Sequence, residues 1–189
     1  MMEPPRTSIQ IPRFLDLVVS LTHISPQNFQ LLLPLLKATL DNIRSTDVLM
    51  LMNVIQFYTN LLESSPSPEI LTFLEPKLPY LINTLSPDAD AFQSLMGAGT
   101  CEFLTALRTR PEFKRLDQRY GILKALEGHA FNLASPQHVP ALLAFSKIAA
   151  TEGMREYIDP KVMETYRKIV DKKKETGQVS RFELHDATG

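Results

Sequence analysis

Apolar residues follow helical spacing along almost the whole of this chain. In residues 27–44 the polar positions lie three and four residues apart and form one line: Gln27, Gln30, Lys37, Asp41 and Arg44, with Pro34 on the same line. This spacing predicts a helix that exposes one narrow stripe to solvent. Pro34 frees a backbone carbonyl on that stripe, where water can satisfy it, so we expect a kink in the helix rather than a break.

Residues 47–63 are more apolar still. One thin polar line is made by Asn53, Gln56, Asn60 and Glu63, and the residues around it are Val48, Leu49, Met50, Leu51, Met52, Val54, Ile55, Phe57, Tyr58, Leu61 and Leu62. A helix that is apolar over most of its circumference must be covered by other helices on most sides. The short connection at residues 44–47 predicts that this helix runs antiparallel to the preceding one.

Similar patterns predict helices in the rest of the chain. The expected ranges are 68–74, 77–85, 88–108, 117–127, 136–151 and 160–174, with Gly128, Gly153 and Gly177 as end signals. In residues 88–108 the expected inward side chains include Phe92 and Leu95. The last helix is apolar on one face only, through Val162, Met163, Tyr166, Ile169 and Val170. A terminal helix of a stack shows this pattern because it has neighbours on one side only.

The predicted fold class is therefore all-α. We expect a short right-handed α-solenoid of armadillo/HEAT-like antiparallel helix pairs, with about eight helices, because the paired units are roughly 40–50 residues long and near the period of these repeats. A compact helical bundle without repeats is the alternative. The expected organisation is a disordered N-terminus at residues 1–10, one helical domain at residues 11–176 and a flexible tail at residues 177–189.

Ser-Pro pairs mark several of the expected helix starts. They occur at residues 25–26, 65–66, 67–68, 86–87 and 135–136, and Asp159-Pro160 repeats the pattern. A serine side chain can accept hydrogen bonds from the amides of a helix's first turn, and proline at the next position gives up an amide that has no partner there. We interpret these pairs as helix starts; phosphorylation of the serines is the alternative.

Composition and charge further limit the fold class, the kind of partner and the cellular compartment that we expect. Glycine is scarce, with 7 residues, and proline plentiful, with 14, which disfavours a β-rich fold with recurring glycine turns. The net charge of −1 gives no overall basicity that would point to nucleic acid. Cys101 is the single cysteine, so no disulfide can form within the chain, which indicates a reducing compartment, the cytoplasm and also the nucleus. With no uninterrupted apolar run of about 18 residues and no signal-peptide pattern, we expect no membrane span.

Candidate catalytic and metal-binding groups are scattered. Cys101 lies on the apolar side of an expected helix, where a cysteine acts as a small buried hydrophobic residue. The histidines, which we interpret as single surface or capping residues, are far apart and have no neighbours at metal-ligand spacing: His23, His129, His138 and His185. We therefore expect no enzyme, with no catalytic residue, no metal site and no cofactor.

Two further motifs have structural explanations. Gly97-Ala98-Gly99 resembles part of a phosphate-binding loop, but no strand precedes it and no Lys-Ser/Thr follows. We expect a patch of small residues within a helix that lets a neighbour approach closely or lets the helix bend. Asp88 and Asp90 fall in an expected first helical turn, where negative charge is favoured without any catalytic role.

A cluster of basic residues is the candidate binding site. This basic cluster comprises Arg108, Arg110, Lys114, Arg115, Arg119 and Lys124, and only Glu112 and Asp117 interrupt it. It covers the end of one expected helix, the turn at Pro111 and the start of the next helix. Turns at one edge of a solenoid form a surface, so a partner with acidic groups would fit it. A solvated loop with local ion pairs is the alternative, and the lack of interleaved aromatic residues argues against nucleic acid.

Two segments resemble a known family. Residues 54–85, which read Val-Ile-Gln-Phe-Tyr-Thr-Asn-Leu-Leu-Glu-Ser-Ser-Pro-Ser-Pro-Glu-Ile and end in Leu-Pro-Tyr-Leu-Ile-Asn-Thr-Leu, resemble a helix-pair unit of the proteasome non-ATPase regulatory subunit 5 family. Residues 117–126, Asp-Gln-Arg-Tyr-Gly-Ile-Leu-Lys-Ala-Leu, are similar to a helix near that family's C-terminus. The resemblance implies an armadillo/HEAT-like chaperone that holds one ATPase subunit of the proteasome regulatory particle during assembly.

The expected function is thus non-enzymatic protein binding, as a scaffold or an assembly chaperone. The alternative is a structural helical subunit packed permanently in a larger complex. A scaffold or chaperone should be monomeric alone, because its apolar faces are satisfied within the chain, whereas an obligate subunit should aggregate alone.

Overall fold

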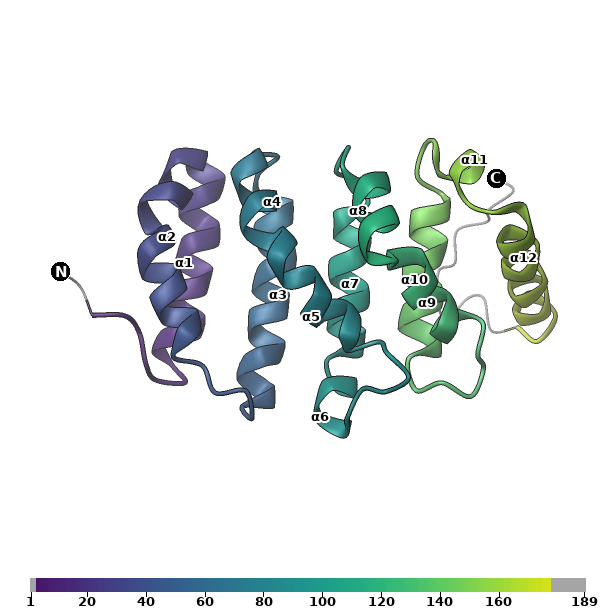
Figure 1. Ribbon diagram of the computed structural model, residues 1–189, viewed down its shortest axis with the longest axis horizontal. Coiled ribbons are helices and arrows are strands. Elements are labelled where there is room, and N and C mark those ends of the chain that lie inside the picture. The colour runs from purple at the N-terminus through teal and green to yellow at the C-terminus, as the bar shows by residue number, and fades with distance from the viewer. Residues whose placement is uncertain (1–2, 178–189) are drawn as a thin grey trace. The chain divides into compact units, whose positions relative to one another are not determined.

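The computed structural model describes residues 3–177, and within that range the chain forms helices and no β-strand (Figure 1). The all-α prediction is confirmed. The helices group into two compact units, Met1–Ala106 and Leu107–Gly189. The first helix begins at Gln10. The disordered N-terminus, the single domain at residues 11–176 and the flexible tail stay predictions, and residues 178–189 lie outside the described part.

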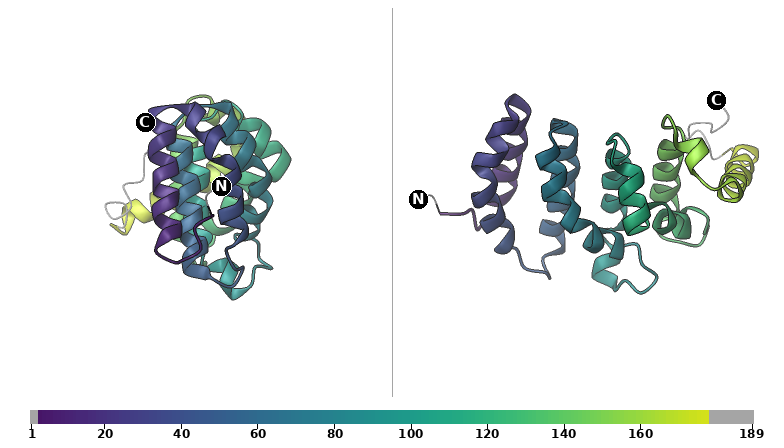
Figure 2. Two further views of the ribbon diagram at one scale, coloured as in Figure 1. Left: turned by 90° about the vertical axis from the view of Figure 1, so that its left-hand side faces the viewer. Right: turned by 45° about the horizontal axis from the view of Figure 1, so that its top comes forward.

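The first unit is built from two layers of helices (Figures 1 and 2). Its elements are α1 (Gln10–Ile24), α2 (Pro26–Asp41), α3 (Val48–Ser64), α4 (Pro68–Leu74), the 3-10 turn η1 (Glu75–Lys77), α5 (Leu78–Asn83), α6 (Ala91–Ser94) and α7 (Gly97–Leu107), whose last residue belongs to the second unit. One layer contains α1, α3 and α7. The other contains α2, α4 and α5, because α1 packs against both α2 and α3, and α3 packs against α4.

A chain of aromatic contacts joins the two layers. Phe29 of α2 meets Phe73 of α4 edge to face, with ring centroids 5.5 Å apart. Tyr58 of α3 lies 6.3 Å from Phe73 and 6.4 Å from Phe103 of α7. Edge-to-face pairs at these separations add to the free energy gained from burying the rings. Tyr58 therefore joins α3 to α4 and α7, and Phe73 extends the chain of contacts to α2.

Helix α3 is covered on most of its circumference, as its apolar pattern predicts. Its buried residues are Met50, Val54, Ile55, Phe57, Tyr58, Thr59, Leu61 and Leu62. The prediction is wrong at the first turns, where Leu49 is 75% and Met52 45% exposed. These two residues precede Asn53 and Gln56 at helical spacing, so they continue the solvent-facing stripe back to the start of the helix.

Helix α2 runs through Pro34 without a break, and all the polar residues of its predicted stripe are exposed. Leu31 also lies on the exposed side, at 79% exposure. Only Phe29, Leu36 and Thr39 of this helix are buried. The neighbouring leucines are half-buried because α2 has a partner on one side only.

Proline marks three of the expected helix starts, since Pro26, Pro68 and Pro160 are the first residues of their helices. The expected side-chain caps from Ser25 and Ser67 are wrong. The Ser25 hydroxyl instead donates to the side chain of Gln27, 2.5 Å away, and the Ser67 hydroxyl donates to Glu69. Asp159 does cap its helix, because its carboxylate accepts from the amide of Lys161 at 2.8 Å.

The remaining Ser-Pro pairs do not begin helices. Pro66 precedes Ser67, and Pro87 and Pro136 lie in turns before α6 and α10. The hydroxyl of Ser86 accepts from the amide of Asp88 at 3.2 Å, and that of Ser135 accepts from the amide of Gln137 at 3.0 Å. These serines stabilise local turns rather than helix ends.

The long helix expected at residues 88–108 is divided. Asp90 and Gln93 form a reciprocal capping box around the short helix α6, and a turn at residues 95–96 separates it from α7. Phe92 and Leu95, which we expected to face inward, are more than half exposed because this break removes them from the register of α7. Asp90 therefore caps a helix, as its charge suggested, and Asp88 lies in the turn before it.

The second unit packs its helices around α10. Its elements are α8 (Phe113–Tyr120), α9 (Ile122–Ala130), α10 (His138–Ala149), α11 (Met154–Tyr157) and α12 (Pro160–Glu175). Both α9 and α11 contact α10, and α8 contacts α9. Tyr166 of α12 is fully buried against Phe145, with ring centroids 5.1 Å apart, and its hydroxyl donates to Ser146 at 2.8 Å. One face of α12 is thus buried, as the one-sided pattern predicts.

The helix expected at residues 117–127 is in fact two helices. Gly121 has a φ of 70°, ends α8 in the left-handed conformation, and precedes the first residue of α9. Asp117 then accepts a hydrogen bond from the amide of Leu123 at 2.7 Å, which satisfies a free donor in the first turn of α9. Gly128 does not end this helix, which continues to Ala130. Such breaks give twelve α-helical segments over residues 3–177 in place of about eight.

The small-residue patch of α7 has the packing role that its sequence suggested. A Cβ atom added to Gly99 would lie 3.3 Å from Cγ2 of Ile55 on α3. The helices α3 and α7 therefore approach each other at a position where a side chain would push them apart.

We predict opposite effects for substitutions at two helical glycines. Gly99→Leu should lower the free energy of unfolding by about 1–3 kcal/mol, because the added atoms overpack the contact with Ile55. Gly128→Ala, where no atom lies within 4 Å of the new Cβ, should raise it by about 0.5–1 kcal/mol through helix propensity. Urea unfolding of each variant measures both values. Equal stability of wild type and Gly99→Leu would contradict the close approach.

Candidate functional site

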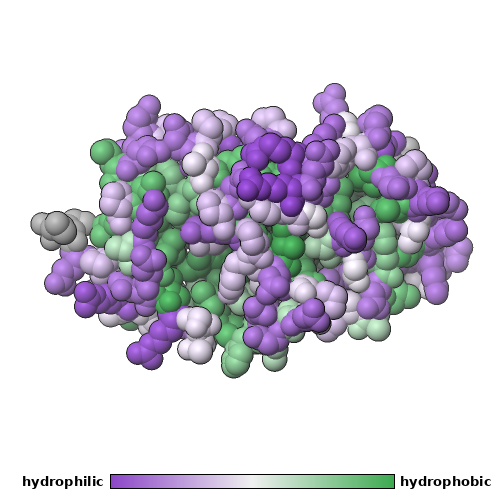
Figure 3. Space-filling model, viewed as in Figure 1, coloured by the Kyte–Doolittle hydropathy of each residue, from purple (hydrophilic) through white to green (hydrophobic). Residues whose placement is uncertain are grey.

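An apolar groove lies in the first unit, between α3 on one side and η1 and α5 on the other. Its volume is about 280 Å³, and it is lined by Leu51, Val54, Ile55, Tyr58, Pro76, Lys77 and Tyr80. The lining residues of α3 lie three and four positions apart, so one face of that helix forms a wall of the groove. Figure 3 shows hydrophobic atoms at the surface over α3, flanked by more polar side chains.

The rim of this groove combines aromatic and cationic groups. The ammonium of Lys77 lies 4.6 Å from the ring centroid of Phe73 and 5.7 Å from that of Tyr58. Burial lowers the pKa of Lys77, and the nearby carboxylate of Asp41 opposes that shift. Tyr80 is 43% exposed, and its hydroxyl contacts the sulfur of Met96 at 3.5 Å. An apolar group that enters the groove would therefore meet a positive charge at its edge.

The basic cluster predicted from the sequence lies in the second unit, over α8, the turn before it and the start of α9. Figure 3 shows strongly hydrophilic side chains gathered over α8. Lys114, Arg115, Arg119 and Lys124 are exposed and Arg108 is half-buried. Arg110 is only 7% exposed, and burial lowers its pKa. Arg110 therefore contributes to the interior rather than to a binding surface.

Two of the exposed cations stack on neighbouring rings. The ammonium of Lys114 lies 5.5 Å from the ring centroid of Tyr157, and the guanidinium of Arg119 lies 5.3 Å from that of Tyr120. Arg115 and Arg119 are four residues apart on α8 and so share one helical face. The structure thus brings Arg115 and Arg119 together and places Lys114 against α11.

Asp117, which interrupts the basic cluster in the sequence, is a structural hub. Besides capping α9, its carboxylate accepts a hydrogen bond from the hydroxyl of Tyr157 at 2.5 Å. Burial and this hydrogen bond raise the pKa of Tyr157 to about 12. The carboxylate therefore joins α8, α9 and α11.

Two further acidic residues, Glu127 and Asp159, lie next to this hub, and the sequence did not indicate either of them as part of a site. A depression of about 400 Å³ is lined by Asp117, Gly121, Leu123, Lys124, Glu127, Tyr157, Ile158 and Asp159. Burial and the charges of Asp117 and Asp159 raise the pKa of Glu127. The basic cluster thus borders a carboxylate-rich depression, which no pattern of sequence spacing reveals because residues from three helices form it.

The candidate nucleophile is buried. Cys101 is 1% exposed, and burial raises the pKa of its thiol to about 12, so the thiol stays protonated at neutral pH. A protonated thiol is a poor nucleophile. Over residues 3–177, no group of three or more histidine, cysteine, aspartate or glutamate side chains could hold a metal ion.

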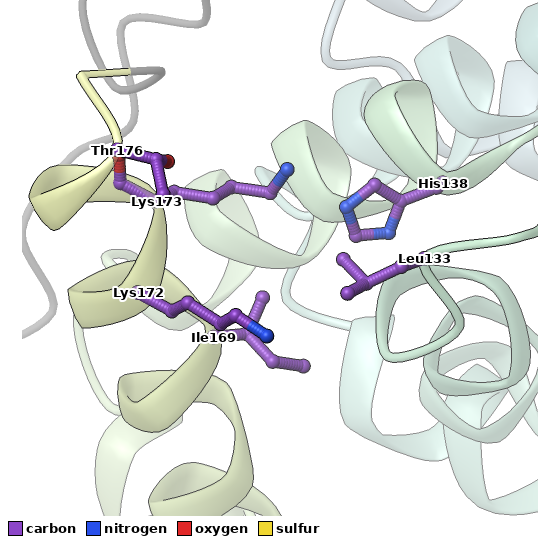
Figure 4. Close-up of a pocket in the computed structure, with 6 residues that line it drawn as sticks. All are labelled: Leu133, His138, Ile169, Lys172, Lys173 and Thr176. Carbon is purple, nitrogen blue, oxygen red and sulfur yellow. The ribbon is translucent and has the colours of Figure 1, made fainter.

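The histidines differ from the prediction at one position. His23 is exposed and lies 3.1 Å from the carbonyl of Ser64, and His129 lies 2.6 Å from the hydroxyl of Ser135. His138, in contrast, is only 6% exposed. It is the first residue of α10 and lines a pocket together with residues from the end of α12 (Figure 4), so it is a buried residue rather than a surface one. His185 lies outside the described residues.

Within the described range, no helix combines the length and hydropathy that a membrane span requires. Comparisons of this chain with protein-family models, curated proteins and solved structures gave no match.

Removal of the Tyr157 hydroxyl tests the Asp117 hub. Tyr157→Phe should lower the free energy of unfolding by about 1 kcal/mol, through loss of one hydrogen bond to a charged group. Because the pKa of Tyr157 is raised to about 12 from 10.0, its contribution to stability is complete below pH 10 and is lost as the pH rises through 12. Wild type should therefore lose its stability advantage over Tyr157→Phe across that range.

Urea unfolding at several alkaline pH values measures this difference, and Tyr120→Phe serves as the control that should retain the alkaline loss. A constant stability difference between wild type and Tyr157→Phe from pH 9 to pH 12 would contradict the role of the hydrogen bond.

Proposed function

We propose that this chain is a non-enzymatic scaffold that binds another protein, and that the groove over α3 takes an apolar side chain of that partner. The observation that carries the proposal is the groove itself, which places one half-exposed and one exposed apolar residue, Leu51 and Tyr80, around a buried aromatic floor. Exposed apolar grooves with a polar rim are typical of protein-binding sites.

The chemistry of the groove indicates the kind of segment that it binds. A volume of about 280 Å³ suits one or two apolar side chains rather than a whole helix face. Lys77 at the rim favours a carboxylate next to the apolar anchor, because its ammonium is half-buried and a nearby negative charge would stabilise it. The expected ligand is thus a peptide segment with an apolar residue beside an acidic one.

We extend the proposal to a specific architecture and a specific partner. The two layers of the first unit support a short right-handed α-solenoid of the armadillo/HEAT type, and such solenoids bind partners along their helical surfaces. The resemblance of residues 54–85 to the proteasome non-ATPase regulatory subunit 5 family supports an ATPase subunit of the proteasome regulatory particle as the partner, in the cytoplasm or the nucleus. Residues 54–85 include six of the residues that line the groove: Val54, Ile55, Tyr58, Pro76, Lys77 and Tyr80.

The second candidate function is that of a structural subunit packed permanently in a larger complex. Large exposed apolar side chains at the N-terminal end of the first unit favour it: Ile9, Leu17, Ile24, Leu31 and Leu49 are each at least half exposed. Apolar residues at this exposure are often covered in an assembly. The purified chain separates the two functions, because a scaffold elutes as a monomer, whereas a permanent subunit aggregates without its complex.

A charge placed in the groove should abolish partner capture. We predict that Tyr80→Asp lowers the capture of the proteasomal ATPase subunits, each produced separately and tested in a pull-down, by at least tenfold, as for a central interface residue. Leu31→Asp is the matched control, because it makes the same change at an exposed apolar residue outside the groove. If Tyr80→Asp captures the ATPase subunits as well as wild type does, and circular dichroism shows unchanged helix content, the groove is not part of the binding site.

A separate prediction concerns the basic cluster. Reversal of its shared face with Arg115→Glu and Arg119→Glu should weaken capture of an acidic partner without unfolding the chain, because both side chains are exposed. The control reverses two exposed basic residues of α12, Lys161→Glu and Arg167→Glu, with the same change in net charge. Equal loss of capture in both double variants would show that net charge, not the basic cluster, affects binding.

A further inference from the structure

Tyr80 connects the groove over α3 to the short helix α6. Its hydroxyl contacts the sulfur of Met96, a buried residue that lies between α6 and α7. Burial and the negative charge of Asp90, the N-cap residue of α6, raise the pKa of Tyr80. The ring of Tyr80 therefore lines the groove, and its hydroxyl end lies beside α6.

Helix α6 presents two large apolar side chains to solvent. Phe92 is 57% and Leu95 58% exposed, and the two residues are three positions apart in one helical turn, so they share a face. Figures 1 and 2 show α6 in the connection between α5 and α7, where it projects beyond the ends of both helices. Large apolar side chains that are exposed side by side are typical of protein-binding surfaces.

Local hydrogen bonds hold α6 in place. Asp90 accepts from the amide of Gln93 at 2.8 Å, and the side chain of Gln93 accepts from the amide of Asp90 at 3.1 Å. The preceding turn is closed by Ser86, whose carbonyl accepts from the amide of Ala89 at 3.0 Å. Because these bonds already order the element, little free energy is lost in ordering it when a partner binds its apolar face.

The α6 end of this surface is negatively charged. Asp88 and Asp90 are exposed, and residues 78–107, which form α5, α6 and α7, contain no lysine or arginine. Two exposed carboxylates in a stretch of chain without cations favour a basic residue on the partner that binds there.

The other end of the surface carries positive charge. Lys77 directly precedes α5, whereas α6 follows it (Figure 1), so the ammonium of Lys77 and the carboxylates of α6 lie toward opposite ends of α5. The charges of Asp41 and Lys37 both act on Lys77 and oppose each other. With two lysines and one carboxylate, this end has an excess of positive charge and favours an acidic residue on the partner.

We propose that the groove and α6 form one binding surface, and that its partner is an amphipathic segment with an acidic residue at one end, apolar side chains in the middle and a basic residue at the other end. The acidic residue lies at Lys77, one apolar side chain enters the groove, and another contacts Phe92 and Leu95. Opposite charges at the two ends fix the direction of the segment. This inference rests on the proposed function, because the groove supplies the first apolar site.

Binding of synthetic peptides to the full chain, measured by titration calorimetry, tests the proposal. The dipolar probe is acetyl-Glu-Glu-Ala-Leu-Leu-Ala-Gln-Leu-Leu-Ala-Lys-Lys-amide, and two single-sign peptides carry glutamate at both ends or lysine at both ends. The dipolar probe should bind about fivefold more tightly than either single-sign peptide at low ionic strength, and high salt should reduce the difference.

The outcomes separate this inference from the proposed function. Equal affinity of the three peptides would overturn the inference, and loss of their binding in Tyr80→Asp would then show that the groove alone binds apolar segments. If none of the peptides binds, the inference fails as well, and the capture of the ATPase subunits decides the proposed function separately.

Variants on α6 test its apolar face. Phe92→Gln and Leu95→Gln should each weaken binding of the dipolar probe by about threefold to tenfold, because each removes an apolar contact. Both side chains are more than half exposed, so neither change should affect folding. Leu133→Gln is the matched control, because Leu133 of the second unit is exposed to the same 58% as Leu95. Wild-type affinity in both α6 variants would overturn the proposal.

A charge reversal tests the α6 end. In Asp88→Lys the preference should reverse, so that the peptide with glutamate at both ends binds more tightly than the dipolar probe. Glu152→Lys makes the same change in net charge at an exposed turn residue of the second unit, and it should keep the wild-type preference. The same preference in both variants would overturn the assignment of the basic residue to α6.

Discussion

The need to cover apolar helix surface is the constraint on which the first unit depends. Helix α3 has so little polar surface that it must contact neighbours on most sides, and the contacts of Tyr58 with Phe73 and Phe103 show how this is achieved. Because Gly99 has no side chain, α7 can also approach Ile55 of α3 closely. The contact of Tyr58 with Phe73 then fixes α4 of the second layer against α3, and the edge-to-face contact of Phe29 with Phe73 holds α2 beside α4.

Incomplete coverage is what gives this unit a surface for binding. The same face of α3 that is buried at Tyr58 is only half covered at Leu51, where it lines the groove opposite η1 and α5. The short 3-10 turn places Lys77 beside two aromatic rings, so the groove has an apolar floor and a charged rim. In the second unit, polar groups join helices and line a pocket. Asp117 joins three helices, and His138 and Lys173 are buried together beside a pocket.

Polar residues close in sequence have unlike environments in this fold. Within the basic cluster, Arg110 is buried, Lys114 lies over Tyr157, and Arg115 and Arg119 remain exposed on α8. Of the three consecutive lysines of α12, Lys173 is buried whereas Lys172 and Lys174 are exposed. Successive residues of a helix point about 100° apart, so a run of like charges cannot form a single surface. Charge clusters read from sequence therefore identify a region of the chain but not a binding face.

The sequence by itself determined the helical class, the position of α3 in the interior, the exposed stripe of α2, the one-sided burial of α12 and the packing role of Gly99, because each depends on residue spacing within one helix. The tertiary structure decided the break at Gly121, the exposure of Phe92 and Leu95, the burial of His138 and the groove at Tyr80. These depend on which helices meet, and on side chains such as Asp117 that satisfy backbone groups of a neighbouring helix. Such contacts join residues far apart in the chain, and spacing within one segment carries no information about them.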